Sequence, residues 1–177
     1  AGAVSRPARR SEQHSMIPNR HEEPSGYGYR HRGRQNSGSG SPDAGSGDFS
    51  LLHQLTWFNM AIHSNAEYAR GTWFKERSLA GPVIFAVADG LVHHADTLAE
   101  FLAQDGYEIH AYIGVDRMKI TAPVLFGDTL RAEAEVVDLR PTKNPERFLF
   151  AYQNKAYNQR DQQVIEYQTT MLVVKKD

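Results

Sequence analysis

The chain contains no cysteine among its 177 residues. Disulfide bonds, thiolate metal ligands and a cysteine nucleophile are therefore all excluded. An excess of charge of either sign is absent too, because 20 Lys and Arg stand against 21 Asp and Glu, for a formal net charge of −1. The composition thus gives no electrostatic argument for nucleic acid or an anionic membrane surface as a partner.

Long apolar runs are also absent. No stretch approaches the roughly 18 apolar residues that a membrane-spanning helix needs. The first residues, 1–11, carry arginines and lack the apolar centre of a secretory signal. We therefore expect a cytoplasmic protein; an organelle transit peptide is a weaker alternative that rests on composition alone.

Large apolar side chains are scarce in residues 1–47, which are rich in Gly, Ser and Arg. The segment 36–47, NSGSGSPDAGSG, has the composition of a flexible linker. We expect residues 1–47 to form a disordered leader, with an edge strand in the alternating segment 27–31 as an alternative. Residues 48–177 then form one domain.

The first half of this domain has helical patterns. A helix is expected from about Asp48, with Ser46 or Asp48 as its cap, and a short helix over 66–70 follows Ser64 or Asn65. A third helix begins at Pro82 and is apolar on nearly all sides, so it is expected to be buried. Its inward positions are Val83, Ile84, Val87 and Leu91, and Gly90 is expected to weaken its end. Residues 93–105 predict a further amphipathic helix.

After Gly106 the apolar period changes to two, which is typical of strands with one buried face. Strands are expected over 117–120, 130–136, 147–157 and 164–174, with turns at 126–128, 141–145 and 158–161. Helices followed by antiparallel strands predict an α+β domain whose sheet buries one face on the helix starting at Pro82.

His63 and Gly81 are the candidates for chemistry. Gly81 precedes Pro82 at a helix start, where a backbone N–H points outward at the positive end of the helix dipole. A titratable imidazole and such an N–H together can move a proton and polarise a carbonyl. Asp89 could supply a carboxylate to the same site, or be a polar residue near the helix end. His93 and Asp96 share a helix face, but without further ligands we predict no metal site.

Two motifs resemble those of the MaoC-like dehydratases, the group that contains the R-specific enoyl-CoA hydratases. Residues 122–130, APVLFGDTL, resemble the PV-x-x-GDTL segment, and residues 62–69, IHSNAEYA, followed by Phe74 and Gly81, resemble the run around the catalytic histidine. The surroundings of the histidine are most similar to the mesaconyl-CoA hydratase-like branch. The resemblance covers 48–174 and implies a hotdog fold, a long antiparallel sheet wrapped around a central helix.

The resemblance also implies an activity, the addition or removal of water across the α,β double bond of an acyl-CoA thioester. His63 matches the catalytic histidine and Gly81 the residue whose N–H binds the thioester oxygen. The hydratase motif D-x-N-P-x-H is altered, with its D, N and P positions at Phe58, Met60 and Ala61. The nearest polar side chain is Asn59, one residue off register. Asn59 and Pro82 are candidate substrate contacts, and Asp89 a candidate replacement for the missing carboxylate.

The resemblance implies CoA as the substrate's handle, with no metal and no redox cofactor. A homodimer or higher homo-oligomer is expected because an exposed sheet edge invites pairing. Two alternatives stay open. A hotdog acyl-CoA thioesterase would use the same oxyanion donor and attack the carbonyl with the help of a carboxylate. A non-catalytic acyl-binding or assembly subunit is favoured by the altered aspartate position.

Overall fold

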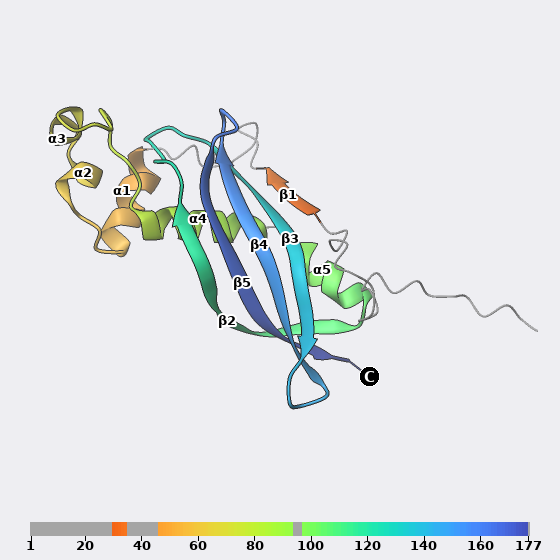
Figure 1. The fold of residues 1–177 in the computed structure, drawn as a ribbon. Helices are drawn as coiled ribbons and strands as arrows, with labels where there is room; N and C mark the ends of the chain where they lie inside the picture. Colours follow the sequence, from red (N-terminus) through yellow and green to blue (C-terminus); the bar gives the residue numbers. More distant parts are fainter. Residues whose placement is uncertain (1–29, 35–45, 94–96, 177) are drawn as a thin grey trace, which may run out of the picture.

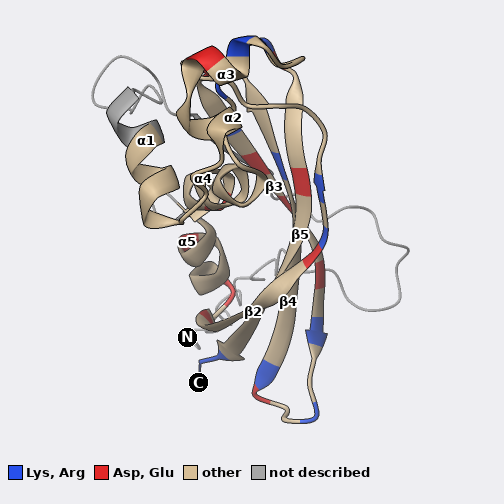
Figure 2. Cartoon of the chain, turned by 90° about the vertical axis from the view of Figure 1, so that its left-hand side faces the viewer, with Lys and Arg blue, Asp and Glu red and all other residues tan. Residues whose placement is uncertain are grey.

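The computed structural model describes residues 30–34, 46–93 and 97–176. A five-stranded antiparallel sheet has the strand order β1-β3-β4-β5-β2, and the helices lie on one side of it (Figures 1 and 2). The strands are β1 (Arg30–Arg34), β2 (Tyr107–Ile120), β3 (Leu130–Pro141), β4 (Arg147–Asn158) and β5 (Gln163–Lys175). The helices are α1 (Ser46–Leu55), α2 (Ala61–Ser64), α3 (Ala66–Arg70), α4 (Gly81–His93) and α5 (Thr97–Gln104).

Helix α4 is the centre of the core, and the sheet curves around it (Figure 2). Val83 and Ile84 are only 1% and 2% exposed, and Ala88, Leu91 and Val92 on the same helix are buried as well. They pack against the inward side chains of β3, β4 and β5, which alternate with outward ones as the period of two requires. The predicted α+β arrangement, a sheet wrapped around an apolar helix, is confirmed.

The helix is buried on most sides, as predicted, but one strip of α4 faces away from the sheet. Pro82, Ala86 and Gly90, spaced four residues apart on one helix face, are exposed, and Val87 is only partly buried. Gly90 does not end the helix, which continues to His93.

Strand β2 is much longer than the predicted segment 117–120, because it begins at Tyr107. Its register against β5 shifts at three places, and each shift interrupts the alternation on which the sequence prediction depends. Met118 and Ile120 alternate with Arg117 and Lys119 in the sequence, but they are 49% and 39% exposed and so are not on a buried face.

Strand β1 falls inside the segment predicted to be a disordered leader. It pairs with β3 from Arg30 opposite Glu135 to Arg34 opposite Arg131, and it shares two residues with the alternative strand prediction at 27–31. Backbone hydrogen bonding to an open sheet edge needs no apolar side chain, so composition gives little sign of such a strand. The rest of the leader up to residue 45 lies outside the described residues.

None of the helices in the described ranges is long and apolar enough to cross a membrane.

Asp128 holds together the turn that follows β2. Its side chain is buried, and it accepts hydrogen bonds from the Leu125 N–H (2.9 Å) and from Gln159 Nε2 (2.7 Å), with Arg160 NH1 3.1 Å away. Gly127 takes a positive φ of 84°, which the turn requires. The turn therefore fixes the loop that joins β2 to β3.

Asp128→Ala is expected to lower the free energy of unfolding by about 2–4 kcal/mol, because it removes a buried acceptor and leaves its donors unpaired. Urea unfolding measures the change. Asp138→Ala is the matched control, since its carboxylate forms a more exposed ion pair with Arg140 and is expected to contribute at most about 1 kcal/mol. Equal losses in the two variants would contradict a special role for Asp128.

Candidate functional site

His63 lies near the end of the short helix α2 and is only 8% exposed. Asn65 caps the next helix by accepting a hydrogen bond from the Tyr68 N–H at 3.0 Å, which fixes the turn after the histidine. His63 Nδ1 lies 2.6 Å from the carbonyl oxygen of Ser78. A carbonyl only accepts, so Nδ1 carries the proton and, in the neutral ring, Nε2 carries the lone pair. His63 is thus held in the tautomer of a base acting through Nε2.

His53 is a site residue that the sequence analysis missed. Its ring, 2% exposed, stacks on His63 with centroids 5.0 Å apart and an interplanar angle of 20°. Its Nε2 accepts a hydrogen bond from the Ala80 N–H at 3.1 Å and so ties α1 to the residue just before α4. The available signal was its position next to Leu52, which packs against the core.

Gly81 opens α4, and its N–H is among the first amides of the helix, which have no acceptor within it. A cavity of about 410 Å³ is lined by both His63 and Gly81. A Cβ at Gly81 would meet Ile120 Cγ1 at an ordinary 3.6 Å, so packing does not require glycine there. The structure therefore brings together the two residues predicted to manage the proton and the carbonyl oxygen.

The remaining walls of the cavity are mainly apolar. They come from α2, from the segment after α3, from α4, and from the end of β2 with the following loop. The lining residues besides His63 and Gly81 are Met60, Ile62, Trp73, Phe74, Ser78, Leu79, Ile84, Ile120, Thr121, Ala122 and Pro123. Such a lining suits an acyl chain with one reactive polar end.

Asp89 is not among the residues that line this cavity. It lies eight residues after Gly81, which is about 12 Å along the helix axis. Its carboxylate accepts a hydrogen bond from the Tyr167 hydroxyl at 3.2 Å, and its Oδ2 lies 3.8 Å from His93 Nδ1. The structure therefore places Asp89 in a second polar cluster and does not bring it to His63.

Burial dominates the electrostatics of this second cluster. It raises the pKa of Asp89, against the attraction of His93 and the hydrogen bond from Tyr167. Burial and then the charge of Asp89 also raise the pKa of the Tyr152 and Tyr167 phenols. Tyr152 contacts His93 Nε2 at 3.1 Å, so the cluster links α4 to β4 and β5.

Asp89→Asn is expected to raise the melting temperature at neutral pH by a few degrees. A carboxyl whose pKa is raised on folding contributes stability that is fully present below its unfolded pKa and is lost as the pH rises through the folded pKa. The asparagine variant does not titrate, so its advantage should grow from about pH 4 upward and then level off. Thermal melts across this range measure it, with Asp138→Asn as the exposed control; an advantage that is constant with pH would refute the explanation.

The two predicted substrate contacts, Asn59 and Pro82, are exposed and are not among the residues that line the cavity. At the altered motif positions, Phe58 packs against the core and Met60 lines the cavity. The position of the family's aspartate is thus occupied by an apolar contact.

Comparison with known proteins gives no matching family model and no matching curated protein. Solved structures do match. They include the monoamine oxidase regulatory protein of Archaeoglobus, with a TM-score of 0.67 at 21% identity over 84% of this chain and 90% of that one. A MaoC-like dehydratase from Rhodospirillum rubrum has a TM-score of 0.59 at 21% identity, covering 84% and 89%. An R-hydratase from Pseudomonas aeruginosa has a TM-score of 0.56 at 23% identity, covering 84% and 80%. The predicted hotdog fold is confirmed by this likeness.

Proposed function

We propose that this protein is a hydratase/dehydratase that adds or removes water across the α,β double bond of an acyl-CoA thioester, in the manner of the mesaconyl-CoA hydratase-like branch. The observation that carries the proposal is that His63 and the first residue of α4, Gly81, line the same apolar cavity. An imidazole with a free lone pair and a helix-start N–H are the two groups that such a reaction needs.

In the hydration direction, His63 Nε2 takes a proton from water as the water oxygen bonds to the β-carbon of the enoyl thioester. The electron pair of the double bond moves toward the thioester carbonyl, whose oxygen becomes enolate-like and is held by the Gly81 N–H. The proton on His63 then passes to the α-carbon, and the carbonyl re-forms. Dehydration is the same path reversed. Each preorganised donor of this kind contributes about 2.7–4 kcal/mol to lowering the barrier.

The Ser78 carbonyl supports this role without a carboxylate. It accepts the Nδ1 proton at 2.6 Å and so fixes both the tautomer and the direction of the ring. The stacked ring of His53 limits rotation from the other side. Asp89 is not needed in this scheme, since it bonds Tyr167 and does not line the cavity.

We also propose a homodimer formed through β2. This strand pairs only with β5 and forms one edge of the described sheet. It carries four exposed large apolar side chains, Tyr112, Ile113, Met118 and Ile120. An open edge with this composition favours pairing with a second chain, and Ile120 also lines the cavity.

The test is a panel of enoyl-CoA and 3-hydroxyacyl-CoA esters followed by both enoyl absorbance and release of free thiol. Loss of the enoyl absorbance with the thioester intact supports the hydratase. Thiol release would select the thioesterase, and binding without turnover of any ester would select the non-catalytic acyl-binding subunit.

A further inference from the structure

The segment just before α4, residues 77–79, pairs with residues 124–126 in the loop that follows β2. Two main-chain hydrogen bonds close the pairing: the Leu79 N–H to the Val124 carbonyl at 2.8 Å, and the Phe126 N–H to the Arg77 carbonyl at 3.0 Å. Between these bonds, Ser78 and Leu125 lie opposite each other as an antiparallel bridge. Residues in that position do not bond each other, so their main-chain polar groups point away from the pairing.

Two of these outward-pointing groups have partners of their own. On one side, the Ser78 carbonyl accepts a hydrogen bond from His63 Nδ1 at 2.6 Å. On the other side, the Leu125 N–H donates to Asp128 Oδ2 at 2.9 Å. The Ser78–Leu125 bridge therefore connects the carboxylate of Asp128 to the carbonyl that orients His63, through contacts that are all direct.

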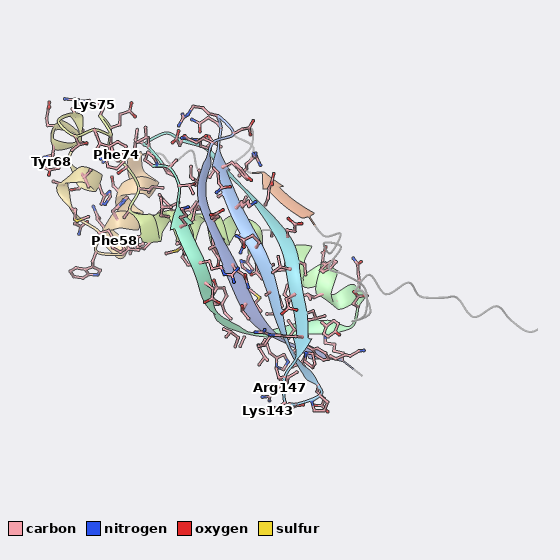
Figure 3. All side chains as sticks on the ribbon, viewed as in Figure 1. Phe58, Tyr68, Phe74, Lys75, Lys143 and Arg147 are labelled. Atoms are coloured by element: carbon pink, nitrogen blue, oxygen red, sulfur yellow. The ribbon has the colours of Figure 1, made fainter. Side chains whose placement is uncertain are left out.

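The carboxylate at the far end of this connection is held firmly. Asp128 is 5% exposed and Ser78 is 3% exposed, so bulk water has little access to either residue. Asp128 Oδ1 accepts a hydrogen bond from Gln159 Nε2 at 2.7 Å, in the turn between β4 and β5. The same loop also supplies residues 121–123 to the cavity wall. It lies at the end of the sheet beside the lobe of α1, α2 and α3, away from the end that carries Lys143 (Figure 3).

We infer that Asp128 is a positioning residue for the reaction, which acts on His63 through the bridge between Leu125 and Ser78. The inference rests on the proposed function and adds a carboxylate that does not itself line the cavity. Without this carboxylate the Leu125 N–H loses its acceptor, and the loop that pairs with Ser78 is no longer fixed. A shift of the Ser78 carbonyl then turns the His63 ring, and a misplacement of about 1 Å can cost about 100-fold in rate.

The test compares Asp128→Ala with Gln159→Ala by steady-state kinetics, at a temperature at which circular dichroism shows both variants to be folded. Asp128→Ala is expected to lower kcat for enoyl-CoA hydration by about 10- to 100-fold, with a smaller change in KM. Gln159→Ala is the matched control, because it removes a hydrogen bond of the same carboxylate and leaves the Leu125 contact in place. Its kcat should stay close to that of the unaltered protein.

A second readout does not depend on activity. The proton on His63 Nδ1 is held by the Ser78 carbonyl, so it should give a protected signal in proton NMR spectra, assigned by its loss in His63→Ala. This signal should shift or weaken in Asp128→Ala and persist in Gln159→Ala. A merely structural role of Asp128 would leave it in place in every folded variant.

Two outcomes would overturn the inference: equal kcat values in Asp128→Ala and Gln159→Ala, or an unchanged His63 signal in folded Asp128→Ala. If Asp128→Ala keeps full hydratase activity, the hydratase stands and the positioning role fails. If no enoyl ester is hydrated and the His63 signal still changes in Asp128→Ala alone, the positioning of His63 stands and the hydratase fails.

Asp128→Asn provides the test if Asp128→Ala does not fold. Its amide has one acceptor oxygen for two donors, the Leu125 N–H and Gln159 Nε2. Adding Gln159→Ala removes one donor and leaves the oxygen for Leu125. The double variant should therefore be at least as active as Asp128→Asn alone, although it is less stable. A double variant that is slower than both single variants would contradict the inference.

Discussion

His63→Ala is expected to lower kcat/KM for enoyl-CoA hydration by about 10²–10⁴, the range typical of a lost general base. The reason is local: the variant leaves the Gly81 N–H and the apolar walls in place but removes the imidazole that we propose as the base. Steady-state kinetics from enoyl absorbance measure the loss. Added imidazole should restore part of the activity, which a purely structural defect would not allow.

The matched control is His110→Ala, which removes an exposed histidine on β2 and should change kcat/KM less than twofold. Asp89→Asn should be nearly silent in the same assay, because its carboxylate bonds Tyr167 and lies about 12 Å along α4 from Gly81. A large loss in Asp89→Asn that is non-additive with His63→Ala would instead show that the two residues act as a unit. Full activity in His63→Ala would refute the proposed base.

The parts of the fold that follow from local patterns were predictable from the sequence. The alternation of apolar residues in β3 predicts a strand with one buried face, and the apolar run of α4 predicts a buried helix. Gly81 with Pro82 marks the start of that helix. The pairing of His63 with Gly81 followed from their residue types at a helix start and from the resemblance, and both residues line one cavity.

The contacts that complete the site depend on chain segments far apart in sequence. Ser78 is 15 residues from His63, and Ala80 is 27 residues from His53, so no periodicity predicts either hydrogen bond. The expectation for Asp89 was open for a similar reason. The sequence pattern placed Asp89 on α4, but it could not show which side chains its carboxylate would contact. In β2 the register shifts remove the alternation itself, which is why most of that strand was missed.

Val83→Asp is expected to prevent folding. Val83 is 1% exposed on α4, in the core formed with β3, β4 and β5. An unpaired carboxylate there must be desolvated or protonated, and removing the valine also loses about 1.5–3 kcal/mol of apolar burial. Together these costs approach the whole stability of a domain, about 5–15 kcal/mol.

The matched control is Ala86→Asp, which places the same charge on the exposed strip of the same helix, three residues away. It should leave a cooperatively melting protein, as measured by circular dichroism and by the soluble fraction after expression. A soluble, cooperatively folded Val83→Asp protein would refute the assignment of α4 as the helix that the sheet surrounds, because no other helix described here presents so many buried apolar side chains to it.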